Sequence, residues 1–142
     1  MTKKYEMLAD DNLKAGDRIL YRIRALRDFA DVRRGDVGGY IESESVLAHD
    51  GDSWVQDVAQ VYGPNARVGG NARISGEAWV LGQVDGDAEI CDLVVIEEQA
   101  YVGGRTVLRG DEIVRGDPLR AMERRRANAR ASAASRIARL TI

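Results

Sequence analysis

The sequence predicts a mainly β protein built on a single-stranded parallel β-helix, with an N-terminal β cap and a C-terminal α-helix. Three observations support this fold class. A unit of a small residue, a variable residue and then Val or Ile returns about every six residues across positions 45–116. Turn-forming residues fill the gaps between most units. Fifteen Gly against one Phe is typical of a chain that turns often.

The repeat unit has a direct structural meaning. Alternate side chains of a strand share a face, so the small residue and the branched residue point inward while the middle one points outward. Stacked turns then bury a face that no single unit can bury alone. A sandwich would need longer strands with turns every eight to twelve residues. The ten units are 53–55, 59–61, 66–68, 72–74, 78–80, 88–90, 94–96, 100–102, 106–108 and 112–114.

Two steps of the repeat are irregular. The step from Ala59 to Ala66 is seven residues, and the step from Ala78 to Ala88 is ten. The stretch LGQVDGD is interpreted as an irregular connection, and the repeat does not fix the register of the coil across residues 81–87.

The flanks of the repeat differ from it in pattern. Residues 1–44 are expected to form a β-rich cap, with strands in KYEML and RILYRIRAL. Gly38 and Gly39 there allow either a positive φ or a close backbone approach. Residues 117–142 are expected to form a basic α-helix over about 118–140, because Asp117 can cap it and Pro118 suits its first turn. Its apolar stripe contains Leu119, Met122, Ala129, Ala133, Ile137 and Leu140.

Charge divides the chain unevenly. Residues 115–142 hold eight Arg against two acidic residues, whereas residues 1–114 hold 13 basic against 21 acidic residues. No apolar run is long enough to cross a bilayer, and the N-terminus has no secretory pattern. A lone cysteine, Cys91, fits a reducing compartment. We therefore expect a cytoplasmic protein that does not enter a membrane.

Several stretches resemble known β-helix proteins. ISGEAW and VGGNAR fit the hexapeptide repeat of left-handed parallel β-helices. LYRIRALRDF, DVRRGDVGGYIESE, HDGDSWV and the NARV and EAWV units resemble the YdcK-type proteins over about residues 4–114, a group common in phages and prophages. The resemblance implies three hexads per triangular coil, and ten units then give a little over three coils. Hexapeptide β-helices include many acyltransferases, usually trimers with a histidine general base at the subunit interface.

Candidate chemistry is sparse. His49 beside Asp50 is a weak candidate for a general base, with a solvated or hydrogen-bonded histidine as the alternative. His49, Asp50 and Asp52 are common turn residues, so we expect no metal and no cofactor. Asp92 beside Cys91 raises a thiol pKa, which indicates a structural cysteine.

The outward positions of the later units become apolar, which marks a contact surface. Either the C-terminal helix of the same chain or another subunit covers them, and a helix exchanged between subunits satisfies both. The candidate interface comprises Trp79, Val95, Tyr101, Val107, Ile113, Leu119, Met122, Ile137 and Leu140. The basic patch comprises Arg120, Arg124, Arg125, Arg126, Arg130, Arg136 and Arg139, which can pair with an acidic surface or with nucleic-acid phosphates.

The sequence therefore favours a non-enzymatic binding or structural protein that presents a surface as a dimer or trimer. With a phage or prophage setting, its partner is expected to be a host protein, such as a nucleic-acid-binding defence complex that it inhibits. A trimeric acyltransferase relative and a nucleic-acid-binding protein that uses the Arg-rich helix are the alternatives.

Overall fold

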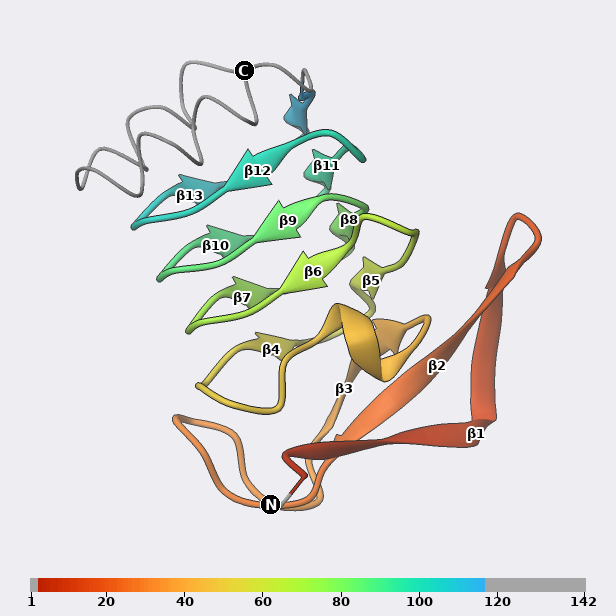
Figure 1. Cartoon of the computed structure of the whole chain (residues 1–142). Coiled ribbons are helices and arrows are strands. Elements are labelled where there is room, and N and C mark those ends of the chain that lie inside the picture. Colours follow the sequence, from red (N-terminus) through yellow and green to blue (C-terminus); the bar gives the residue numbers. More distant parts are fainter. Residues whose placement is uncertain (1–2, 117–142) are drawn as a thin grey trace.

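The computed structural model describes residues 3–116, which form a parallel β-solenoid of about four turns with a β-hairpin at its N-terminal end (Figure 1). The hairpin pairs β1 (Tyr5–Ala15) with β2 (Arg18–Ala25), and β3 (Val37–Ile41) and a short 3-10 helix, η1 (Glu44–Val46), lead into the coil. No helix within residues 3–116 has the length and apolar character needed to span a membrane. The predicted helix over 118–140 lies outside the described residues.

Eleven strands of two residues build the coil within residues 54–114. They are β4 (Trp54–Val55), β5 (Gln60–Val61), β6 (Arg67–Val68), β7 (Arg73–Ile74), β8 (Trp79–Val80), β9 (Gln83–Val84), β10 (Glu89–Ile90), β11 (Val95–Ile96), β12 (Tyr101–Val102), β13 (Val107–Leu108) and β14 (Ile113–Val114). Ten of them match the predicted units. The eleventh, β9, lies in the stretch that was interpreted as an irregular connection, so that interpretation was wrong.

The strands stack into three sheets, one for each face of the coil. The first sheet has the order β1-β2-β3-β5-β8-β11-β14, the second β13-β10-β7-β4 and the third β12-β9-β6. On the first sheet Gln60, Trp79, Val95 and Ile113 are in register, so successive turns contain 19, 16 and 18 residues. The average is close to the three hexads expected, and the second turn is short.

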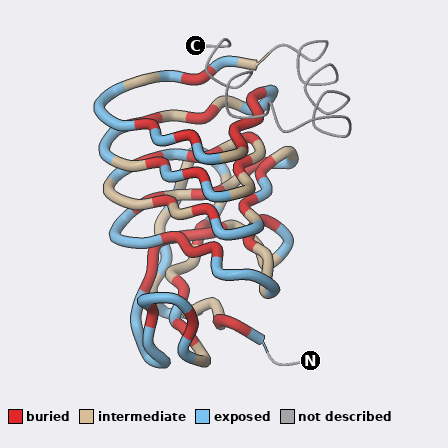
Figure 2. Tube along the Cα trace, turned by 90° about the vertical axis from the view of Figure 1, so that its left-hand side faces the viewer, coloured by how far each residue is buried: buried red, intermediate tan, exposed pale blue. Residues whose placement is uncertain are grey.

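The interior confirms the predicted inward positions. Ala59, Ala66, Ala72, Ala78 and Ala88 are fully buried, as are the branched residues that end the same units. Figure 2 shows buried positions alternating with less buried ones along the walls, and exposed stretches at corners of the coil. A narrow core of Ala beside Val or Ile lets neighbouring turns stack at about 4.8 Å with their backbone groups hydrogen-bonded.

The corners carry residues that accept a positive φ. Gly70, Gly86 and Gly104 occupy one corner with φ of 60°, 66° and 64°. At another corner Asp57 and Asp92 adopt φ of 59° and 58°, and their carboxylates accept the N–H groups of glycines one turn further on. Asp tolerates this conformation better than most residues do, and its carboxylate ties the turns together.

The cap closes the first turn of the solenoid. Trp54 points outward from the coil but is only 2% exposed, because Phe29 packs edge-on against it at 5.3 Å and Tyr5 lies at 6.5 Å. A Cβ on Gly38 would lie 2.8 Å from the Trp54 ring, so the close backbone approach, and not a positive φ, explains this glycine. Covering the sheet edge in this way protects it from association.

A buried lysine anchors the start of the chain to the cap. The Lys4 ammonium donates to the Ser53 carbonyl at 2.6 Å and the Ser53 hydroxyl at 3.2 Å, and it lies 5.1 Å from the centre of the Phe29 ring. Burial, helped by the Arg27 charge, lowers the pKa of Lys4 to about 8 from an ordinary value of 10.5.

Stability is therefore expected to rise with pH above about 8. In that range the unfolded chain holds the Lys4 proton that the folded chain has released, so the free energy of unfolding increases by about 2 kcal/mol between pH 8 and 10. Above pH 10 the gain is opposed, because burial raises the pKa of Tyr5 and only the unfolded chain ionises. Urea unfolding of wild type and Lys4→Met across this range measures the effect. Equal slopes for the two proteins would contradict it.

Candidate ligand-binding notch

The structure places His49 in a hydrogen-bonded network of the cap. Its Nδ1 accepts the Lys4 backbone N–H at 3.1 Å, its Nε2 lies 2.8 Å from a Glu44 carboxylate oxygen, and its ring stacks on Tyr5 at 4.3 Å. This bonding requires the proton on Nε2. The hydrogen bonds from His49 and Lys3 lower the pKa of Glu44, so its carboxylate is ionised at neutral pH. Both ring nitrogens of His49 thus have hydrogen-bond partners, and the weak assignment of His49 as a general base stays a prediction.

The other candidate reactive residues, Asp50, Asp52 and Cys91, are not grouped into one site. Asp50 and Asp52 are exposed, and residues 3–116 contain no group of three or more His, Cys, Asp or Glu placed to hold a metal ion. Cys91 donates to the Leu108 carbonyl at 3.5 Å. Burial, followed by the Asp92 charge, raises the pKa of the thiol, in the direction predicted.

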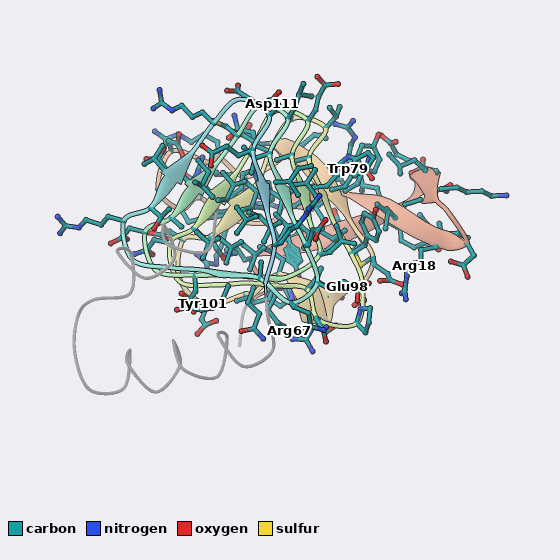
Figure 3. The ribbon with its side chains drawn as sticks, turned by 90° about the horizontal axis from the view of Figure 1, so that it is seen from above. Arg18, Arg67, Trp79, Glu98, Tyr101 and Asp111 are labelled. Atoms are coloured by element: carbon teal, nitrogen blue, oxygen red, sulfur yellow. The ribbon has the colours of Figure 1, made fainter. Side chains whose placement is uncertain are left out.

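The predicted interface residues occupy three faces. Trp79, Val95 and Ile113 form one column on the first sheet, and Trp79 and Ile113 are each 45% exposed. Val107 lies on the second sheet. Tyr101 lies on the third, buried, with its hydroxyl donating to Asp85 at 2.7 Å. Figure 3, a view down the coil, shows Trp79 and Tyr101 on different sides. The predicted residues beyond Gly116 lie outside the described part, so the interface stays a prediction.

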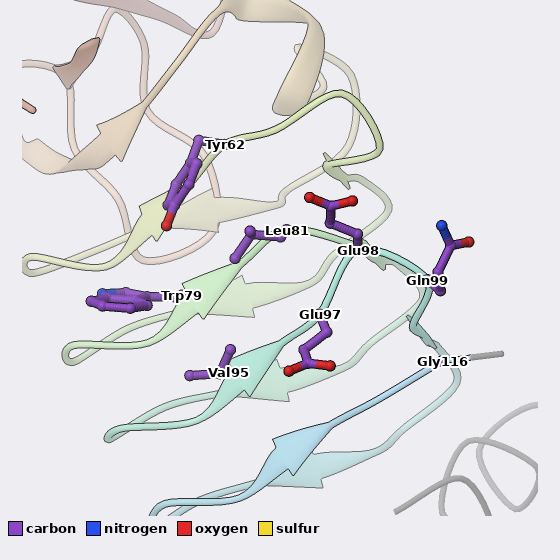
Figure 4. Close-up of a pocket in the computed structure, with 8 residues that line it drawn as sticks. All are labelled: Tyr62, Trp79, Leu81, Val95, Glu97, Glu98, Gln99 and Gly116. Carbon is purple, nitrogen blue, oxygen red and sulfur yellow. The ribbon is translucent and has the colours of Figure 1, made fainter. Parts of the chain in front are cut away.

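A hollow lies beside Trp79, at the corner between the first and third sheets. In the first turn this corner contains residues 62–66 and in the third turn residues 97–100, but in the second turn only Leu81 and Gly82. Beside this shorter corner the structure has a notch of about 460 Å³. The residues that line it are Tyr62, Trp79, Leu81, Val95, Glu97, Glu98, Gln99 and Gly116 (Figure 4).

Gly82 makes the short corner possible. It occupies the position that alanine holds in other units, and it is buried. A Cβ there would lie 2.5 Å from the Ala100 carbonyl oxygen and would also overlap the Glu97 carbonyl oxygen. The third-turn corner therefore rests directly on Gly82, which sets the position of the Glu97 and Glu98 backbone beside the notch.

The notch has an apolar side and an acidic side. In Figure 4 Trp79, Leu81 and Val95 lie toward the sheet, and Glu98 and Gln99 lie on the corner. Glu97 is half-buried and pairs with Arg115 at 3.6 Å. Glu98 is exposed and has no hydrogen bond or ion pair within residues 3–116.

The upper edge of the notch adds a hydroxyl group. Burial raises the pKa of Tyr62, so its hydroxyl stays protonated at neutral pH and can donate a hydrogen bond. The Arg18 charge, which reaches Tyr62 and Glu98, is paired with Glu42 at 2.5 Å. The notch is therefore suited to a ligand with an apolar body and a positively charged group, which an aromatic face and carboxylates both attract.

Sequence reasoning missed Tyr62, Leu81, Glu97, Glu98 and the strand β9. One signal was available: Gly82-Gln83-Val84 repeats the small, polar, branched pattern with glycine in place of alanine. Taken as a unit, it divides the ten-residue step from Ala78 into four and six residues. A four-residue step implies a shortened corner, and the residues around that corner are then candidates for a hollow.

Comparison with known proteins gives one short similarity. The chain is 46% identical over 39 residues to the uncharacterized acetyltransferase YdcK of Escherichia coli strain K12. The matched stretch is 28% of this chain, and the chain covers only 12% of the length of that relative. No protein-family model matches. The named relative contradicts the prediction of a non-enzymatic protein and lends support to the acyltransferase alternative. The similarity does not support a phage origin or an inhibitory role.

Proposed function

We propose that the chain binds an amine in the notch and promotes transfer of an acyl group to it. The observation that carries this proposal is that the half-exposed Trp79 lines the same notch as Glu97 and Glu98. The matching relative, which is named an acetyltransferase, supplies the class of reaction. The handedness of the coil is also a proposal: the sequence resemblance implies a left-handed coil.

Each side of the notch has a role in the proposed reaction. Trp79 and Val95 pack against the apolar body of the amine, and the carboxylates attract its charged form. The bound ammonium first loses one proton to solvent. The neutral nitrogen then attacks the carbonyl carbon of an acyl thioester, so a C–N bond forms and the C–S bond breaks. After attack the nitrogen is far more acidic than the free ammonium, and Glu97 or Glu98 accepts its proton and passes it to the departing thiolate.

The predicted dimer or trimer remains a proposal beside this function. Leu93, Val107 and Ile113 are each about half exposed and provide apolar surface for such a contact. Light scattering on the full chain measures the assembly directly. Nucleic-acid binding gains no support, since the arginines expected to carry it lie outside the described residues.

The proposed activity is tested with phenethylamine and a small acetyl thioester, S-acetyl-N-acetylcysteamine, by following the free thiol. Wild type is expected to release thiol in proportion to amide formed. Glu97→Gln/Glu98→Gln removes the proton acceptor and is expected to lower the rate by about 100-fold. The matched control, Glu77→Gln/Asp111→Asn, changes the same charge at a different corner and leaves the rate unchanged.

His49→Ala separates this site from the histidine alternative. Its rate, corrected for the folded fraction, is expected to equal that of wild type, because His49 bonds within the cap. Absence of transfer by wild type rules out the proposed activity with these substrates. Loss of transfer in His49→Ala together with full activity in Glu97→Gln/Glu98→Gln returns the reaction to the histidine.

A further inference from the structure

The notch also lies where the described chain ends. Gly116 lines it, and a Cβ on Gly116 would overlap the Gln99 carbonyl oxygen, so the backbone leaves the solenoid directly against the acidic corner. Residues 117–142 continue from this wall of the notch. We infer that the notch is the docking site for this basic C-terminal segment of the same chain.

Charge complementarity supports this occupant. Residues 117–142 contain seven Arg against Asp117 and Glu123, whereas residues 3–116 contain 14 basic against 21 acidic residues. The first pair of this kind is already formed, since Arg115 lies 3.6 Å from a Glu97 oxygen. Glu98, one residue further along the same corner, is exposed, and the nearby Arg18 charge is already paired with Glu42. A following arginine can supply a cationic partner for Glu98.

The apolar side of the notch fits the beginning of the segment. Leu119 and Met122 follow Gly116 by three and six residues, which is an extended reach of about 10 Å and about 20 Å. Both residues are therefore tethered within about 20 Å of Gly116, which lines the same notch as Trp79 and Leu81. Docking would cover a half-exposed tryptophan that has an apolar neighbour on its own sheet.

Docking of the segment and binding of an amine would use the same notch. A docked arginine presents the same cation that the proposed amine presents, so segment and ligand exclude each other. The docking itself follows from the notch and the segment and does not depend on acyl transfer. An experiment can therefore rule out the docking without ruling out the acyl transfer, and the reverse.

Acrylamide quenching of tryptophan fluorescence in the full chain tests the docking. The chain has two tryptophans, and Trp54 is buried in the cap, so the quenchable signal reports on Trp79. Trp79→Phe verifies this assignment. In wild type at low salt, Trp79 is expected to be shielded. Glu97→Gln/Glu98→Gln is expected to lower the ratio of docked to free segment by about threefold, since the carboxylate that pairs with the segment is lost.

Three comparisons complete the test. Arg124→Ser/Arg125→Ser/Arg126→Ser and about 0.5 M salt, which shortens the Debye length to about 4 Å, are both expected to expose Trp79. Glu77→Gln/Asp111→Asn is expected to leave it shielded. Equal quenching of Trp79 in wild type and all variants would overturn the inference. Shielding that strengthens with protein concentration, alongside a larger mass by light scattering, would overturn it in favour of a second copy.

Discussion

Replacing Trp54 with alanine is expected to lower the free energy of unfolding by about 3–5 kcal/mol. Trp54 is 2% exposed, and it joins the first turn of the solenoid to Phe29 and Tyr5 of the cap. Its removal leaves a cavity between these two parts, and the surrounding rings cannot close it without moving the backbone at Gly38. Urea unfolding followed by circular dichroism measures the loss.

Trp79→Ala is the matched control for this substitution. Both tryptophans are the middle residue of a repeat unit, but within residues 3–116 Trp79 is 45% exposed and lies away from the cap. Its replacement is expected to cost less than about 1 kcal/mol, as for most surface positions. A similar loss of stability in the two variants would contradict the assignment of Trp54 to the cap and Trp79 to an open notch.

Gly82→Ala is expected to destabilise the protein by about 1–3 kcal/mol, because the added methyl group overpacks the corner. It would lie 2.5 Å from the Ala100 carbonyl oxygen, so the third-turn corner must move and the notch must change shape. The substitution should therefore lower both stability and binding of phenethylamine. Thermal unfolding and calorimetric titration provide the two measurements.

Gly69→Ala adds the same methyl group at a comparable corner. There the nearest atom is the Ala48 Cβ at 3.9 Å, an ordinary contact, and φ is not positive. This control is expected to change stability by no more than about 0.5 kcal/mol. If Gly82→Ala behaves like Gly69→Ala, the short corner does not depend on glycine and the account of the notch is wrong.

The repeat made most of the solenoid predictable, because a small and a branched residue alternating with a free position can bury only one face. The same pattern could not distinguish Trp54 from Trp79. Which outward position is covered depends on contacts from residues far away in sequence, here Tyr5 and Phe29. Local spacing contains no information about such contacts.

The candidate site was harder to predict for a related reason. His49 attracts attention as the single histidine, yet its bonding to Lys4 and Glu44 appears only once the cap is folded. Glu97 and Glu98 look like ordinary corner residues in the sequence. They become candidate site residues because the corner one turn earlier is shorter. Predicting that short corner from the sequence requires recognising Gly82 as a substitute for alanine.

The central claim is that the ligand site is the notch at the shortened corner. Titration of the full ¹⁵N-labelled chain with phenethylamine, followed by amide chemical shifts, tests it most directly. We predict saturable shifts at Leu81, Gln83, Glu97 and Glu98, with little change at the amides of Glu44 and His49. Shifts centred on Lys4, Glu44 and His49, or no saturable shift anywhere in the chain, would contradict it.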